Sequence, residues 1–181
     1  LEDHGSPGLP NVPCEVPPAL PAGALLVTEI FNNATDSDDH KEWFEVFNPG
    51  IDAIDLRGLM ISDTDDDRDW IVDPVVVDPA GFAVLGSNDD LLANGGVILD
   101  YAYDSSWSLG NSGDEVLLHG SDGALVDGVD YDDGPSFPDP TGASQSLDPT
   151  AFDATLNDDG ANWCASPAAP FGPGPDLGSP G

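Results

Sequence analysis

The sequence predicts an all-β protein built as a β-sandwich. Apolar residues show no sustained helical spacing along the chain, which argues against a helical fold. The 21 glycines and 18 prolines divide the chain into short runs that are rich in β-branched and aromatic residues. Short strands between regularly spaced turns are typical of a sandwich. Hydrophobic residues make up 39% of the chain, which favours a folded core over the disorder that an acidic composition can produce.

The first two predicted strands are residues 24–31 and 42–48, with the sequences ALLVTEIF and EWFEVFN. Both carry apolar side chains at odd and even positions, whereas a strand with one solvated face alternates. We therefore expect both faces of these strands to be covered. Glu29 and Glu45 occupy similar places in the two strands and can face each other across the sheet. Two close carboxylates repel unless a cation or a proton lies between them.

The later strands are predicted from short apolar runs that end at turn residues. Pro74 separates two brief runs, and glycines flank two longer ones. The GSDG turn at residues 120–123 joins two apolar runs and predicts a hairpin. In chain order, the predicted strands are residues 24–31, 42–48, 53–62, 69–72, 75–77, 81–86, 96–103, 114–120, 124–131 and 144–147.

Two Pro/Gly-rich arms, residues 1–23 and 165–181, flank a predicted sandwich domain at residues 24–164. Cys14 and Cys164 lie just outside the two ends of the strand-rich region, so we predict a disulfide between them, with two free thiols as the alternative. A disulfide would imply an oxidising compartment. Because the chain begins at Leu1 and not at methionine, we expect that a leader has been removed.

The charge of the chain restricts its partners. Asp and Glu number 35 against three Lys and Arg, which gives a formal net charge of −32. Such a chain cannot neutralise phosphates, so binding to nucleic acid and to anionic membranes is disfavoured. No apolar run is long enough for a membrane span, and we expect no membrane insertion. Self-repulsion must be offset by salt, by divalent cations or by a cationic partner.

Several motifs resemble those of the lamin-tail domain family in order and spacing. They are LLVTEIFNN, EWFEVFNPG, IDLRGLMISD, GFAVLG, SLGNSGDEVLLHGSDGALVDGVDY and NWC followed by a Pro/Gly tail, and they cover about residues 24 to 164. The resemblance implies an immunoglobulin-like β-sandwich and, since this is not an enzyme family, it supplies no catalytic residues. The family includes nuclear lamins and secreted bacterial and archaeal modules. The missing coiled-coil rod and the extreme acidity favour an exported prokaryotic module.

The stretch DTDDDRDW at residues 63–70 is the strongest candidate for a metal site. Its acids at alternate positions suit Ca²⁺, which takes six to eight oxygen ligands. It is not an EF-hand, because Arg68 and Pro74 stand where the turn glycine and the bidentate glutamate belong. A second acidic loop, DSDDH at residues 36–40, offers further ligands. The candidate ligands are Asp36, Asp38, Glu45, Asp63, Asp65 and Asp67. The alternatives are solvated acidic loops and, for Glu45, hydrogen bonds to backbone or hydroxyl groups.

The remaining motifs carry less chemistry. Asn33 begins the sequon NAT and is a candidate glycosylation site. The four tryptophans are expected to pack in or beside the core, with Trp107 as a possible glycan platform. The three histidines form no metal spacing, and neither a nucleophile elbow nor a carboxylate pair in a cleft can be recognised. The sequence therefore predicts a protein that is not an enzyme.

Two functions follow from these observations. The first is a non-enzymatic extracellular structural protein, a subunit that associates with copies of itself in a cell-surface or filamentous assembly stabilised by Ca²⁺. Its extended arms would lie along a neighbouring subunit. The alternative is a monomeric secreted module that binds a glycan or a protein and belongs to a larger surface protein.

Overall fold

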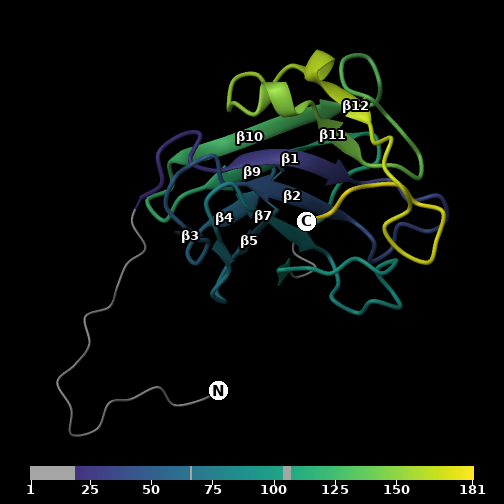
Figure 1. Ribbon diagram of the computed structural model, residues 1–181, viewed down its shortest axis with the longest axis horizontal. Helices are drawn as coiled ribbons and strands as arrows, with labels where there is room; N and C mark the ends of the chain where they lie inside the picture. The colour runs from purple at the N-terminus through teal and green to yellow at the C-terminus, as the bar shows by residue number, and fades with distance from the viewer. Residues whose placement is uncertain (1–18, 66, 104–106) are drawn as a thin grey trace, which may run out of the picture.

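The computed structural model describes residues 19–65, 67–103 and 107–181 and confirms an almost entirely β protein (Figure 1). Within these residues no helix is long and apolar enough to cross a membrane. The strands are β1 (Leu26–Phe31), β2 (Trp43–Phe47), β3 (Ile54–Asp55), β4 (Met60–Ser62), β5 (Arg68–Trp70), β6 (Val76–Val77), β7 (Phe82–Gly86), β8 (Tyr101–Ala102), β9 (Gly113–His119), β10 (Leu125–Asp132), β11 (Gln145–Leu147) and β12 (Trp163–Ala165). Two short 3₁₀ helices are η1 (Pro149–Ala151) and η2 (Gly160–Asn162).

The strands form the two layers of a sandwich. One sheet has the order β12-β11-β1-β2-β7-β8, the other has the order β10-β9-β4-β5, and β3 pairs with β6 in a small separate sheet. Fully buried side chains from both large sheets share one core, among them Phe44 and Val46 from β2 and Val116 and Leu118 from β9. β9 and β10 form the hairpin that the GSDG turn predicts.

A β-bulge in β1 sets the direction of its side chains. The pairing register between β1 and β2 shifts between Val27 and Glu29. Val27 and Ile30, three residues apart, would point to opposite faces of a regular strand. The extra residue lets both reach the main core, where each is completely buried. Glu29 consequently lies on the outer face of the six-stranded sheet.

The outer face of this sheet is also covered, which explains the apolar residues at both parities of β2. Phe31 and Trp43 stack there at 5.7 Å between ring centroids, and Phe171 of the C-terminal arm packs edge-on against both rings. Phe31 and Trp43 are each only 1% exposed. The arm, drawn in yellow, crosses over this side of the sheet (Figure 1).

The C-terminal arm follows an irregular path on its own chain. Its Leu177 N–H donates to the Gly142 carbonyl at 3.0 Å, and the Ser144 N–H donates to the Leu177 carbonyl at 2.9 Å. We expected the arms to lie along a neighbouring subunit, but this arm packs intramolecularly. The N-terminal arm lies largely outside the described residues.

The structure departs from the predicted strands at three main places. The predicted strand 53–62 is divided into β3 and β4, because Gly58 adopts a φ of +81° in the turn between them. The predicted strand 96–103 is reduced to β8, preceded by Gly95 and Gly96, which both have positive φ. β12 was not predicted as a strand, although its residues belong to the NWC motif.

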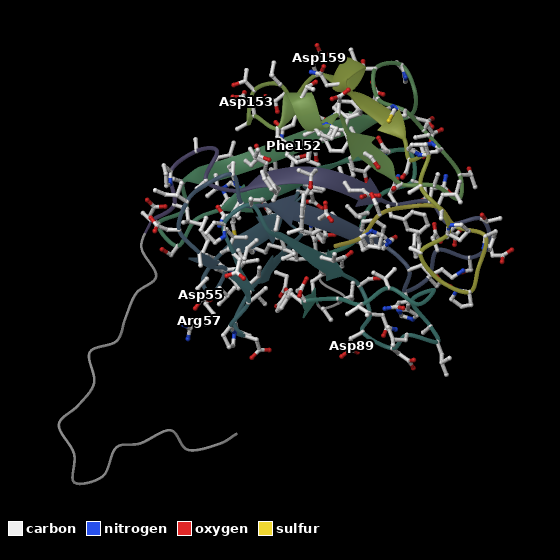
Figure 2. All side chains as sticks on the ribbon, viewed as in Figure 1. Asp55, Arg57, Asp89, Phe152, Asp153 and Asp159 are labelled. Carbon is white, nitrogen blue, oxygen red and sulfur yellow. The ribbon has the colours of Figure 1, made fainter. Side chains whose placement is uncertain are left out.

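Many of the acids form local turns. The side chains of Asp148 and Asp159 cap the two 3₁₀ helices by accepting hydrogen bonds from Thr150 N–H and Ala161 N–H. The same bond from the N–H two residues on is found at Asp55, Asp63, Asp90, Asp122 and Asp153. Part of the acidic composition therefore specifies the loops of this fold. Figure 2 labels several of these acids at the surface of the molecule.

Candidate functional site

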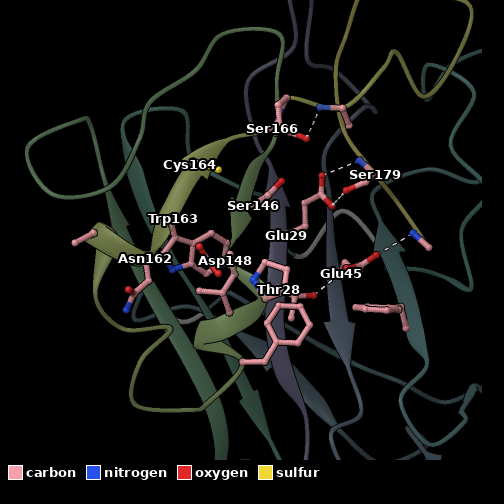
Figure 3. Close-up of a pocket in the computed structure, with 18 residues that line it drawn as sticks. Thr28, Glu29, Glu45, Ser146, Asp148, Asn162, Trp163, Cys164, Ser166 and Ser179 are labelled. Carbon is pink, nitrogen blue, oxygen red and sulfur yellow. Dashed lines mark hydrogen bonds between the residues drawn. The ribbon is translucent and has the colours of Figure 1, made fainter.

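Two glutamates from neighbouring strands form the centre of the candidate site. Glu29 of β1 and Glu45 of β2 are direct cross-strand partners, as the sequence suggested. Their exposed fractions are only 3% and 4%. Their side chains lie on the outer face of the six-stranded sheet, under the end of the C-terminal arm (Figure 3). Two carboxylates in this position require hydrogen bonds, protons or cations to be stable.

Neutral donors hold both carboxylates. Glu45 accepts hydrogen bonds from the Thr28 hydroxyl and from the Gly181 N–H, each at 2.8 Å. Glu29 accepts bonds from the Ser144 hydroxyl, from the Ser179 N–H at 2.9 Å and from the Ser179 hydroxyl at 2.7 Å. The expected backbone and hydroxyl partners of Glu45 are thus present. The arm supplies donors to both glutamates, so the pair and the arm form one unit.

Burial raises the pKa of Glu45 and so favours its protonated form. Desolvation raises the pKa of Glu45 from 4.5 to about 7, hydrogen bonds from Gly181 and Thr28 oppose this rise, and the charge of Glu29 adds to it. Glu45 therefore exchanges its proton near neutral pH. The carboxylate that results is available to an incoming positive charge.

A cavity of about 650 Å³ adjoins the pair. The polar groups that line it include both glutamates and Ser146, whose buried hydroxyl has no hydrogen-bond partner. The wall contains apolar side chains from several elements: Phe82, Leu147, Pro149, Phe152, Trp163 and Pro167. A pocket with apolar walls and a few convergent polar groups is the usual form of a binding site.

A further buried carboxylate, Asp127 of β10, links the two sheets. It is 3% exposed and accepts hydrogen bonds from the Val27 N–H at 2.7 Å and from the Asn157 amide at 2.8 Å. Burial raises the pKa of Asp127 from 3.8 to about 7. Asp127 lies in the core and does not line the pocket.

The two acidic loops that are predicted to supply calcium ligands lie away from the pocket. Loops 36–40 and 63–67 both contact the segment 110–115: Asn111 donates to Asp38, and Thr64 donates to Glu115 at 2.9 Å. Asp63 accepts hydrogen bonds from the N–H groups of Asp65 and Asp67, at 2.7 and 3.2 Å.

The predicted calcium ligands are not brought together as one set. Asp36 lies in a small hollow beside the C-terminal arm, together with Lys41 and Asp176. Glu45 belongs to the pocket on the sheet. Among the described residues, no three His, Cys, Asp or Glu side chains converge as a metal centre. Asp66 lies outside those residues, and calcium binding stays a prediction.

Glu42 is partly buried and lies near the acidic residues Asp38 and Asp114. Its carboxylate accepts a hydrogen bond from the Leu109 N–H at 3.0 Å. Burial raises the pKa of Glu42 to about 7, the Leu109 bond lowers it, and the charges of Asp38, Asp114 and Asp39 raise it further. The acidic surroundings of Glu42 thus favour its protonated form or a positive charge beside it.

The two buried acids and the partly buried Glu42 predict a protein that is more stable in mild acid. The pKa values of Glu42, Glu45 and Asp127 are all raised to about 7. Between their ordinary pKa values and pH 7 the folded state binds more protons than the unfolded state, so the free energy of unfolding falls as pH rises. We expect the free energy of unfolding, measured by denaturation at constant high salt, to be larger at pH 5 than at pH 8. The expected difference is more than about 1.4 kcal/mol, the equivalent of a shift of one pKa unit at one group. Equal stability at both pH values would contradict this assignment.

The remaining predicted residues have varied environments. Trp107 is 2% exposed and packs against Phe44 and Tyr103, so it belongs to the core and offers no glycan platform. Asn33 donates to the Thr141 hydroxyl at 3.3 Å, and its glycosylation stays a prediction. Cys164 is exposed on the edge strand β12, while Cys14 lies outside the described residues, so their disulfide also stays a prediction.

Sequence reasoning did not find most of the pocket. Ser144 and Ser146 alternate in the predicted strand 144–147, so the pattern SQS already indicates that their side chains lie on one face, although β11 itself begins at Gln145. Ser179 and Gly181 carry no local signal, because their partners lie about 150 and 136 residues earlier in the chain. The apolar wall formed by Phe152 and Pro167 follows from tertiary packing alone.

Comparison with known families assigns the greater part of the chain, including both glutamates, to one domain family. No curated protein matches the chain in sequence. The family model of the Lamin Tail Domain matches residues 18–133, which include β1 to β10 and both glutamates. The match ends earlier than the resemblance at residues 24–164 suggests, and β11, β12, the arm and most of the pocket lining follow it. With more than half of its length matched, the chain belongs to the lamin tail domain family.

Proposed function

We propose that the chain is a non-catalytic binding module that takes an extended segment of a partner protein into the pocket beside Glu29 and Glu45. The observation that carries this proposal is the cavity of about 650 Å³, which is lined by apolar side chains and by polar groups that include both glutamates. Its size and chemistry suit a peptide side chain with its neighbours.

The position of the pocket favours a protein segment over a glycan. Cys164 lines the pocket, and its strand β12 is at the edge of the six-stranded sheet. An edge strand accepts an extended segment through main-chain hydrogen bonds, while the adjacent pocket selects a side chain. The charge of −32 favours a partner with basic residues.

Binding is a better reading of the paired carboxylates than catalysis. Retaining glycosidases also use two carboxyl groups at close separation. Here both glutamates accept hydrogen bonds from Ser179 and Gly181 and so hold the C-terminal arm in place. Lamin tail domains are immunoglobulin-like modules that are generally not catalytic.

Selection from a displayed library of random peptides would test the pocket as a binding site. Ala161 lines the pocket and is exposed, so Ala161→Trp should block the pocket with little effect on folding. Ala169 is exposed and does not line it, which makes Ala169→Trp the matched control. We expect selected peptides to lose at least tenfold in affinity for Ala161→Trp and to keep it for Ala169→Trp. Equal binding to both variants, or no enrichment, would contradict the proposal.

The predicted self-association is a separate question. One of its supports is the expectation that the arms lie along a neighbouring subunit, whereas the C-terminal arm contacts its own Gly142 and Ser144. The extracellular location, the filamentous assembly and the need for Ca²⁺ stay predictions from the sequence. Sedimentation velocity with calcium and with chelator distinguishes a calcium-dependent polymer from a single species of 18.7 kDa.

A further inference from the structure

We propose that the pocket binds a primary ammonium group, the end of a lysine side chain, against Glu29, Glu45 and Ser146. This inference rests on the binding function proposed above and names the chemistry of its ligand. It follows from three features of the site: two carboxylates with neutral partners, one buried hydroxyl without a partner, and an apolar wall.

The two carboxylates are not matched by a protein cation. Among the described residues, every donor that reaches Glu29 or Glu45 is a neutral hydroxyl or N–H group. An ionised carboxylate offers about four acceptor positions. Glu45 accepts two of these bonds, so acceptor positions remain on it. The site therefore has free hydrogen-bond acceptors but, within the described part of the chain, no positively charged group to pair with the two carboxylates.

Ser146 supplies an independent sign that a donor is missing. Its hydroxyl oxygen is buried and forms no hydrogen bond. Ser146 is the cross-strand partner of Glu29 on the side away from Glu45, and it lines the same cavity (Figure 3). Buried hydroxyls nearly always find a partner. A ligand donor in the cavity would satisfy it.

The number and arrangement of acceptors favour ammonium over guanidinium. A lysine ammonium has three donors on one compact centre, and the site offers three acceptor groups on three adjacent strands, β11, β1 and β2. A planar guanidinium is best matched by both oxygens of one carboxylate. The four-carbon stem of a lysine would lie along the apolar wall of Phe82, Pro149 and Phe152.

The proton balance of the site gives the proposal a pH signature. The raised pKa of Glu45, about 7, means that an incoming ammonium displaces a proton in neutral solution. Binding should therefore strengthen as pH rises from 6 to 8, while the lysine remains protonated. An uncharged ligand would not require this exchange.

The test compares Nα-acetyl-lysine-N-methylamide, which keeps its side-chain ammonium group, with its norleucine analogue, which lacks only that group. Both are titrated into the isotope-labelled full chain at pH 8 and constant high salt, and amide shifts are followed by NMR. We expect the lysine probe to bind at least tenfold more tightly, with shifts at Thr28, Ser146 and Gly181. Ala161→Trp should weaken binding of the lysine probe.

Two variants and one control test whether Glu45 and Ser146 bind the ammonium group. Glu45→Gln removes the charge; its amide oxygen can accept from the Gly181 N–H while its NH₂ group donates to the Thr28 hydroxyl. We expect the affinity of the lysine probe for this variant to fall to that of the norleucine probe. Ser146→Ala breaks no hydrogen bond within the protein and should weaken the lysine probe several-fold. Asp89→Asn, an exposed acid outside the pocket, makes the same charge change and should alter affinity by less than twofold.

The outcomes separate this inference from the proposed function. Equal binding of the two probes, or an unchanged affinity in Glu45→Gln, would overturn the ammonium site. A response to CaCl₂ in place of the lysine probe would also overturn it, in favour of a metal ion. If selected peptides still bind in a manner that Ala161→Trp blocks, the binding module stands without the ammonium site. If no peptide binds either, the proposed function fails as well.

Discussion

Replacing Asp127 by alanine is expected to lower the free energy of unfolding by about 3 kcal/mol, because it leaves buried donors without partners. The Val27 N–H and the Asn157 amide both donate to Oδ2 of Asp127. Val27 and Asn157 are completely buried, so water cannot replace the lost acceptor. The bond also joins a bulge in β1 to a bulge in β10. Urea denaturation at pH 7 measures the change.

Asp127→Asn is the informative control for this prediction. Oδ1 of Asp127 and Oδ1 of Asn157 are both buried without a partner. Protonation of Asp127 turns its Oδ1 from an acceptor into a hydrogen-bond donor. An asparagine at position 127 would provide a donor in the same place through its NH₂ group. We therefore expect Asp127→Asn to cost less than about 1 kcal/mol at pH 7. A loss as large as that of the alanine variant would show that the folded state needs the ionised form.

The two variants also differ in their response to pH. In the natural protein the raised pKa of Asp127 makes stability fall as pH rises towards 7. Asp127→Asn removes this titration, so its stability relative to the natural protein should improve between pH 5 and pH 8. An unchanged difference across this range would contradict the assignment of a raised pKa to Asp127.

The fold could be predicted from sequence because its signals are local. Short apolar runs, the GSDG turn and the mixed parity of β1 and β2 all indicate strands without reference to distant residues. Errors arose where the backbone conformation overrides the apolar pattern. Gly58 has a positive φ and places a turn inside the apolar run 53–62, and Gly95 and Gly96, which also have positive φ, turn the chain at the start of the predicted strand 96–103.

The candidate site could be predicted only in part. The cross-strand pairing of Glu29 with Glu45 follows from equivalent positions in adjacent strands. Its cover does not, because a Pro/Gly-rich arm has no periodicity that indicates where it packs. The position of the arm is decided by Phe171 against Trp43 and by Ser179 against Glu29. These contacts depend on the finished sheet.

Gly172→Ala is expected to release the arm that completes the site. A Cβ atom at Gly172 would overlap the Gly95 carbonyl oxygen, and the backbone of Gly96 lies directly beside it. Neither neighbour is a flexible side-chain end, so the arm must shift. Overpacking of this kind costs about 1–3 kcal/mol. Since Phe171 precedes the glycine, the shift should also loosen its packing on Phe31 and Trp43.

Gly174→Ala provides the matched control in the same arm. A Cβ atom at Gly174 would meet nothing within 4 Å, so we expect a change within about 0.5 kcal/mol. Hydrogen exchange should show faster exchange at Ser179 and Gly181 in Gly172→Ala and natural rates in Gly174→Ala. Because these N–H groups hold Glu29 and Glu45, their release links the arm to the pocket. Identical exchange in the two variants would mean that the contact with Gly95 does not hold the arm, and that the pocket keeps its shape without it.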